Sequence, residues 1–519
     1  MINYFLLLYQ NFFVDSKSKK FINFSSERWK NKSKPFKKSQ ILVELYSVDQ
    51  TILAFSYFSN ILAKKKKSEI VSFSTSRRSY LLLSIFYRRI FKIYESFNSK
   101  KHISTNFHFY LSDRQSLIFN DILANLKSKS DVLNISIDNI VIGNEIYEAY
   151  LRERLKPTVD INSVDFRKFL LSCLKIFFFW QDYFMENNVK AVILSHGLYK
   201  YGIIRLIAIS KNIPIYLPTV RSMFYLKKPS EVGVPPFNLY PQIFNSLNSE
   251  QKKDALKWSS DRLKRRFSGE VGVDMNYSTK SAFHTNSSKS SSLLKNDRIK
   301  VLIAAHCFFD NPNAYGPNLF ADFFEWLSFL GEMSDITNYD WYLKTHPDVL
   351  PGNNRIIKHL LNKYKKIKLL PPEVSHHQLI NDGIDFVLTV YGSIGHEYAS
   401  FGKIVINAGI NNPHIGYDFN IHAKSVEEYK SIIMHLNKTK LKINRNKIYE
   451  FYYMHYKYFG YNQLFFNSFE SFLNEFSVRN QNSSNSYEYF MNEITPENES
   501  ILCEKISTFI DSGKYKFYD

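Results

Sequence analysis

Hydrophobic residues in the second half of the chain form short runs that alternate with longer segments of helical spacing. Short apolar runs between polar turns are typical of buried strands, and apolar residues three and four positions apart predict helices. The predicted strands are 300–305, 340–344, 367–370, 385–390 and 403–407, and the predicted helices are 319–333, 354–363, 375–380, 395–401 and 425–436. This alternation predicts an α/β fold with a parallel, doubly wound sheet.

The first half carries a less regular version of the same pattern. A strand, helix and strand at 40–46, 51–63 and 69–73 predict one β-α-β unit, and a strand, His-Gly turn, helix and strand at 189–217 predict a Rossmann-like unit. Other predicted helices are 79–94, 113–126 and 166–187, and the segment 138–154 reads as a short apolar run before a helix. The pattern thus predicts two Rossmann-like domains.

A polar, serine-containing stretch separates the two halves. Residues 286–292 read NSSKSSS, so we expect a linker at 259–297. The expected domains are an acceptor-side domain at 1–258, a nucleotide-sugar domain at 298–445 and a helical, aromatic extension at 446–519.

Composition narrows the class of protein. An aromatic content of 16% excludes general disorder. Cys173, Cys307 and Cys503 are too few and too far apart for a disulfide framework or a cysteine-based zinc site, which fits a reducing compartment. No window is apolar for long enough to span a bilayer, and the apolar start at 1–14 lacks the positive region and cleavage site of a signal peptide. We therefore expect a cytoplasmic protein.

The net charge of +20 points to an anionic partner or substrate. Lysine and arginine are spread along the chain, and none of the usual nucleic-acid recognition signatures is present, so no nucleic acid is expected as a partner. Peripheral contact with an anionic membrane and a merely solvated basic surface both remain open.

Residues that follow the predicted strands of the second half are the candidates for chemistry, because ligands of open parallel sheets bind beyond the carboxyl ends of the strands. Those positions hold histidine, asparagine, serine and glycine. The candidates for donor binding are His306, Lys344, Gly392, Ser393, Ile394, Gly395, Glu397 and Asn411, and His346 is the candidate catalytic residue.

The turn from Gly392 to Glu397 is the strongest of these signals. Gly392 and Gly395 lack a Cβ atom, so a ligand can approach the backbone closely, and the helix that follows offers N–H groups and a dipole that suit phosphate. Ser393 adds a hydroxyl, and Glu397 can accept hydrogen bonds from ribose. The alternative is structural: Ser393 caps the helix, and Glu397 is an acidic residue of its first turn.

His346 stands between a strand and a proline, with Lys344 on the same face of the strand. An imidazole in this place can donate to a phosphate or protonate a leaving group. The alternative is a loop histidine with an ordinary partner. The sequence has no H-x-x-x-H helix or aspartate-rich triplet, so neither a metal nor a cofactor is expected.

These motifs resemble those of GT-B glycosyltransferases that build bacterial surface polysaccharides of the capsule or O-antigen type. Residues 344–347 (KTHP) are similar to the HP motif of sialyltransferases and Kdo transferases. Gly392 and Ser393 with Glu397 are similar to their Ser/Thr-rich motif and ribose-binding glutamate, although Gly-Ser replaces paired Ser/Thr. Residues 196–202 and 142–152 are similar to the acceptor-side domain of capsule polysaccharide synthesis proteins.

The resemblance implies two Rossmann-like domains whose parallel sheets face an interdomain cleft. It implies transfer of a sugar from a CMP-, UDP- or GDP-linked donor to a surface polysaccharide or lipid-linked glycan at the inner face of the plasma membrane. His346 would stabilise the departing phosphate, and a carboxylate of the first domain would take the acceptor's proton, with Glu145 preferred over Asp138 and Glu153. A nucleotide-sugar 2-epimerase, a nucleic-acid-binding protein and an inactive partner of a polysaccharide machine are the alternatives.

Overall fold

The chain forms two compact units. The computed structural model describes residues 12–29, 39–75, 85–105, 110–275, 280–284, 292–346, 352–460, 464–466 and 483–517. The first unit consists of residues 1–149, 160–233 and 461–519, and the second of 150–159 and 234–460. Most of the apolar start, residues 1–11, lies outside the described residues.

The unit boundaries differ from the predicted ones. Helix α12 (Ser249–Phe267) runs through the start of the expected linker at 259–297 and buries Ser259 and Leu263. The expected extension at 446–519 divides at residue 460, and its later part belongs to the first unit. The serine and charge content of this segment suggested a linker. Its few apolar residues have helical spacing, however, and the start of the segment is therefore the end of α12.

The sheet of the first unit has the strand order β3-β2-β1-β6-β7-β8. Neighbouring strands are parallel except for β7 and β8, which are antiparallel. The strands are β1 (Gln40–Glu44), β2 (Glu69–Ser74), β3 (Lys101–Ser104), β6 (Val189–Ile193), β7 (Ile215–Pro218) and β8 (Met223–Leu226). A separate antiparallel hairpin joins β4 (Ser136–Ile137) and β5 (Ile140–Val141).

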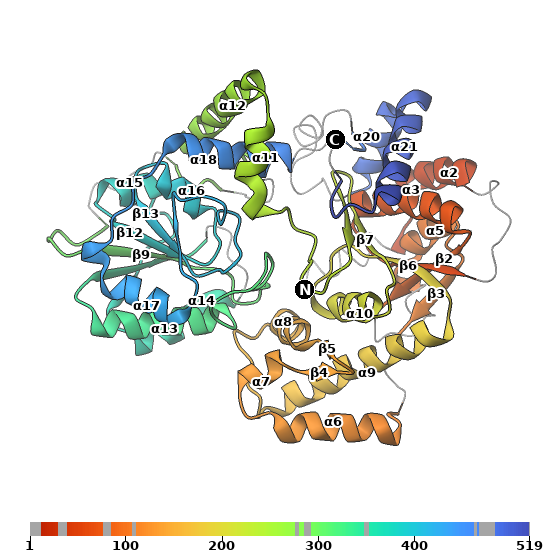
Figure 1. Cartoon of the computed structure of the whole chain (residues 1–519), viewed down its shortest axis with the longest axis horizontal. Coiled ribbons are helices and arrows are strands. Elements are labelled where there is room, and N and C mark those ends of the chain that lie inside the picture. Colours follow the sequence, from red (N-terminus) through yellow and green to blue (C-terminus); the bar gives the residue numbers. More distant parts are fainter. Residues whose placement is uncertain are drawn as a thin grey trace. The chain divides into compact units, whose positions relative to one another are not determined.

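Helices from both ends of the chain pack together in the first unit. Figure 1 shows α20 and α21 beside α2 and α3, and the Tyr487 hydroxyl donates to Asp49 Oδ1 at 2.9 Å, where Arg89 also binds. The helices are α2 (Ser16–Trp29), α3 (Asp49–Lys66), α5 (Arg88–Ser96), α6 (Asp113–Asn125), α7 (Lys129–Leu133), α8 (Gly143–Arg154), α9 (Val164–Glu186), α10 (Tyr199–Ser210), α20 (Asn485–Glu493) and α21 (Pro496–Ser512).

The sheet of the second unit is fully parallel, with the order β11-β10-β9-β12-β13-β14. Its near-continuous apolar strands are buried because helices cover both faces. The strands are β9 (Lys300–Ala304), β10 (Asp340–Lys344), β11 (Ile367–Leu369), β12 (Phe386–Thr389), β13 (Ile404–Asn407) and β14 (Ile421–His422).

Two hydrophobic cores lie on opposite faces of this sheet. Helices α13 (Phe323–Ile336), α14 (Asn353–Lys363) and α17 (Val426–Met434) bury one face, and α15 (His376–Asn381) and α16 (Ile394–Ala399) bury the other (Figure 1). The remaining elements are α11 (Tyr240–Ser246), α12, α18 (Arg445–Tyr452), the 3₁₀ turns η1 (Phe237–Leu239) and η2 (Leu436–Lys438), and the π-helix η3 (Tyr453–Tyr458).

Strand order in both units is that of a Rossmann fold, with the first and fourth strands adjacent. The prediction of an α/β chain with two Rossmann-like domains is confirmed. In the second unit the connections from β9 and β12 leave in opposite directions, which opens a crevice beyond their carboxyl ends. Within the described residues, no helix has both the length and the apolar character needed to span a membrane.

Candidate functional site

A cavity of about 570 Å³ lies at this crevice, entirely within the second unit. We refer to it as the strand-end cavity. Its floor comes from the ends of β9, β10 and β12, and its walls from the end of α12, the loop after it and the α18–η3 segment. A volume in this range suits a small ligand.

Seven predicted residues line the strand-end cavity together. They come from three strands that are distant in sequence: His306, Lys344, His346, Gly392, Ser393, Ile394 and Glu397. Gly395, Asn411 and Glu145 do not line it. Strand polarity alone brings the seven residues to one edge, as expected for a parallel sheet.

Gly395 and Asn411 have other roles than the predicted contact with a ligand. A Cβ atom on Gly395 would lie 2.6 Å from His414 Cε1, so its missing side chain makes room for the protein's own imidazole. Asn411 Nδ2 donates to the backbone oxygen of Tyr315. Both residues therefore shape the loops around the cavity.

Ser393 does not cap α16. Its backbone is helical, with φ −54°, and its side chain makes no capping hydrogen bond. In the described part of the chain, neither the hydroxyl of Ser393 nor the N–H groups of Ser393 and Ile394 form a hydrogen bond. The structural alternative for Ser393 is thereby excluded. Because α16 is only six residues long, its dipole adds little, and the local N–H groups matter more.

His306 fixes the start of the turn from Gly392 to Glu397 through hydrogen bonds. Its Nε2 accepts from the N–H of Val390 at 3.2 Å and lies 3.1 Å from Thr389 Oγ1, which in turn accepts from the N–H of Gly392 at 3.1 Å. Burial, together with a smaller effect of His346, lowers the pKa of His306 to about 3. His306 is thus a neutral imidazole whose hydrogen-bonding pattern assigns the proton to Nδ1.

Lys344 is a buried cation without a counter-ion among the described residues. Only 4% of the residue is exposed, and its ammonium donates to the backbone oxygen of Pro372 at 3.1 Å. Within the described residues it forms no ion pair. Burial lowers the pKa of Lys344 to about 8, and Glu373 opposes this shift weakly from a distance. A buried ammonium in such a place favours an anionic ligand.

His346 lies two residues after Lys344, lines the cavity and is exposed. Burial lowers the pKa of both His306 and His376, and His346 contributes to the lowering in each case. Pro347, the second residue of the HP motif, lies outside the described residues. His346 and Ser393 reach the same cavity from β10 and β12, on either side of β9.

Glu397 is bound by Arg266, a residue that sequence reasoning placed in the linker. Arg266 Nε donates to Glu397 Oε1 at 2.8 Å, and Nη2 donates to the same oxygen. Arg266 Nη1 also donates to Val273 O at 3.0 Å. The buried pair joins α16 to the loop that follows α12.

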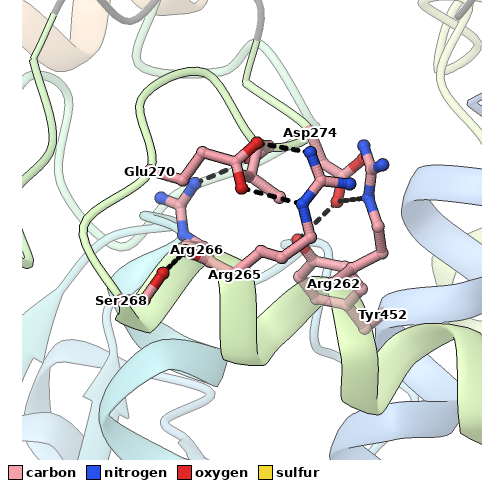
Figure 2. Close-up of polar contacts among 8 residues, drawn as sticks. Arg262, Arg265, Arg266, Ser268, Glu270, Asp274 and Tyr452 are labelled. Carbon is pink, nitrogen blue, oxygen red and sulfur yellow. Dashed lines mark hydrogen bonds and ion pairs between the residues drawn. The ribbon is translucent and has the colours of Figure 1, made fainter.

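That loop is tied down by the neighbouring arginines of α12 (Figure 2). Arg262 binds both carboxylate oxygens of Asp274, whose Oδ2 also accepts from the Tyr452 hydroxyl at 2.7 Å. Arg265 binds Glu270 in the same way. These arginines therefore bind carboxylates of the protein itself, and Arg266 also lines the cavity. The sequence carries no signal for this position, because a basic run at the end of a helix can equally face solvent.

Glu145, the preferred candidate for the base, lies in the first unit, whereas the alternative candidate Glu153 belongs to the second. Glu145 Oε1 accepts from Arg205 Nη2 at 3.0 Å, and Arg205 also donates to the backbone oxygens of Gly197, Pro229 and Glu231. Both partners of this ion pair are buried. Glu145 therefore neutralises Arg205, and Arg205 holds the chain together at Gly197, Pro229 and Glu231.

Glu44 is a buried carboxyl that sequence reasoning overlooked. It ends β1, and its Oε2 accepts from the N–H of Ser195 at 2.6 Å, while Oε1 has no hydrogen-bond partner among the residues that the structure describes. Burial raises the pKa of Glu44 to about 7, against weaker lowering by Ser195 and Tyr201. The available signal was a single glutamate at the end of an apolar strand.

Comparisons with known proteins concern the fold. No protein-family model matches this sequence, and a search of curated proteins gives no match. The chain is similar in structure to the UDP-GlcNAc 2-epimerase of Neisseria meningitidis, solved with UDP-GlcNAc bound, at 12% identity and a TM-score of 0.25, covering 80% of this chain and 97% of that one. It is also similar to KpsC of Thermosulfurimonas dismutans, a beta Kdo 2,4 transferase, at 13% identity and a TM-score of 0.30, covering 52% and 85%.

MurG of Acinetobacter baumannii is a third similar structure, at 10% identity and a TM-score of 0.24, covering 80% of this chain and 95% of that one. The structures that resemble this chain thus include a Kdo transferase and a UDP-GlcNAc 2-epimerase. Similarity at this level does not assign the chain to a family, so the functional argument rests on the strand-end cavity.

Proposed function

We propose that the protein is a glycosyltransferase that binds a nucleotide-sugar donor in the strand-end cavity. Lys344 carries the proposal, because a buried ammonium without a carboxylate partner in the described residues needs an anion to offset its burial. The N–H groups of Ser393 and Ile394 and the Ser393 hydroxyl supply donors of the kind that phosphate oxygens accept.

In the proposed reaction, the bond between the anomeric carbon and the phosphate oxygen breaks, and negative charge develops on the phosphate. His346 donates a hydrogen bond to that phosphate, and Lys344 stabilises its charge. Neutral His306 accepts a hydrogen bond from the N–H of Val390 and keeps the turn from Gly392 to Glu397 in place. It is therefore a positioning residue.

The acceptor is proposed to be a hydroxyl of a surface polysaccharide or lipid-linked glycan, whose proton passes to a base as the new glycosidic bond forms. Pairing with Arg205 favours a structural role for Glu145, and the donor part of the proposal does not depend on it. Contact with an anionic membrane surface belongs to the same proposal and is motivated by the charge of +20.

Binding of CMP, UDP and GDP provides the first test. A ligand at 100 times its Kd raises the free energy of unfolding by about 2.7 kcal/mol, so a thermal-shift series should single out one nucleotide. His346→Ala should retain that shift and lose turnover of the matching nucleotide-sugar. His359→Ala, on the exposed face of α14, is the matched control and should keep both.

Turnover then separates the transferase from its main alternative. Release of free nucleotide that requires a glycan acceptor supports the proposal. If NMR shows that the nucleotide-sugar is interconverted without an acceptor, the protein is an epimerase instead. A wild-type protein that shows no shift with any of the three nucleotides would refute the donor site itself.

A further inference from the structure

Glu397 lines the strand-end cavity, and Arg266 binds only one of its two carboxylate oxygens. Arg266 directs both Nε and Nη2 to Oε1. The other oxygen, Oε2, forms no hydrogen bond in the described part of the chain, although Glu397 lines the cavity and is only 3% exposed. One oxygen is therefore held by the protein, and the other is left to accept from a ligand.

The orientation of Glu397 depends on Arg266, and Arg266 is itself fixed. Its remaining nitrogen donates to Val273 O at 3.0 Å, and Nη2 lies 3.0 Å from Met275 Sδ. The next residue of that loop, Asp274, is clamped by Arg262 and Tyr452 (Figure 2). Since the loop also lines the cavity, one guanidinium connects two of its walls.

The free oxygen fits a neutral hydroxyl better than a phosphate. A carboxylate only accepts hydrogen bonds, and it repels a second anion at close range. Hydroxyl groups donate, and a ribose offers two of them next to the phosphate that Lys344 and the Ser393 turn would hold. A carboxylate fixed at one oxygen can thus recognise one face of a sugar.

We propose that Arg266 is a positioning residue that sets the preference of the cavity for ribonucleotides over deoxyribonucleotides by holding Glu397 Oε2 toward the ribose hydroxyls. This inference rests on the proposed function, because it takes the ligand to be a nucleotide. Beyond the proposed function, it assigns the selectivity of the Glu397 carboxylate to Arg266 and to the loop after α12 that holds Arg266 in place.

The test compares affinities for UDP, CMP or GDP, whichever binds the wild-type protein best, with those for its 2′-deoxy and 3′-deoxy forms. Wild type should bind at least one deoxy form fivefold or more weakly. Glu397→Gln and Arg266→Gln should reduce this ratio to below twofold, while the affinity for the deoxy form stays within about twofold. Arg266→Lys, which keeps the charge but lacks the forked contact, should fall between.

Lys264→Gln removes the same charge from the same turn of α12, where Lys264 is exposed and pairs only loosely with Asp261, and it should retain the wild-type ratio. If Arg266 were merely structural, its variants would weaken ribo and deoxy forms equally, and that result overturns the inference. If Arg266→Gln does not fold, the ratio in Arg266→Lys decides. Failure of every nucleotide to bind wild type would instead refute the proposed function together with this inference.

Discussion

Replacing Lys344 by methionine should stabilise the ligand-free protein while weakening its hold on phosphate. The ammonium is buried without an ion-pair partner in the described residues, and its pKa falls from 10.5 to about 8. Each unit of pKa shift corresponds to about 1.4 kcal/mol, so the charged lysine costs the folded state up to about 3 kcal/mol. Methionine keeps the aliphatic length and removes this cost.

The sign of the pH dependence follows from proton binding. Between pH 8 and 10.5 the unfolded chain holds a proton on Lys344 that the folded chain has lost, so wild-type stability rises with pH across this window. The cost is fully present below pH 8. The stability advantage of Lys344→Met should therefore be largest at pH 7 and shrink toward pH 10.

Urea unfolding of both proteins at pH 7 and pH 9.5 measures the difference, and calorimetry with the nucleotide that binds wild type measures affinity. We expect a gain in the free energy of unfolding of about 1–3 kcal/mol at pH 7 and at least a tenfold loss of affinity, about 1.4 kcal/mol. Lys358→Met, on the exposed face of α14, should change neither. A Lys344→Met protein that is less stable at pH 7, or that binds nucleotide as well as wild type, would refute the reasoning.

Three further predictions concern other buried groups. The pKa of Glu44 is about 7 in the folded protein and 4.5 in the unfolded chain, so the free energy of unfolding of the wild type should fall as the pH rises from 4.5 to 7. Glu44→Gln should remove about 3 kcal/mol of this fall, measured by urea unfolding at pH 5 and pH 8. Gly395→Ala places a methyl group against the His414 ring and should lower stability by about 1–3 kcal/mol, with an unchanged Tm contradicting the packing described above. Glu145→Gln leaves Arg205 buried without its counter-ion and should cost about 3–5 kcal/mol in calorimetry, whereas full stability with lost activity would restore Glu145 as a catalytic base.

The sequence was sufficient to predict every strand of the second sheet except β14 (Ile421–His422), because the other strands are short apolar runs with clear helical segments between them. β10 (Asp340–Lys344) was predicted with its observed limits. Strand polarity then placed His306, Lys344 and Ser393 at one edge, since parallel strands share the direction in which they end. The strands β3 (Lys101–Ser104) and β8 (Met223–Leu226) were missed. They lie at the two edges of the first sheet, and β3 contains only one apolar residue, Ile103, so it gives no apolar run.

Other parts of the site depend on contacts that no local pattern carries. Arg266 stands in a basic run that could equally face solvent, and only folding brings it to Glu397, which is 131 positions away in the sequence. The pairing of Glu145 with Arg205 was likewise beyond reach, because spacing gives no information about counter-ions in another element. The role of Gly395 could not be predicted for the same reason. The sequence shows that the residue lacks a Cβ atom, but it does not show that the His414 imidazole occupies the free space.

The path of the chain between the two units has a consequence for synthesis on the ribosome. The second unit is drawn mainly from one continuous stretch, 234–460, whereas the first is completed by residues 461–519, whose helices α20 and α21 pack on α3. Translation proceeds at about 5–20 residues per second, so the nascent chain must wait tens of seconds with the apolar surface of α3 uncovered. During that interval the uncovered apolar surface of α3 favours aggregation, and a chain truncated before residue 485 would expose that surface permanently.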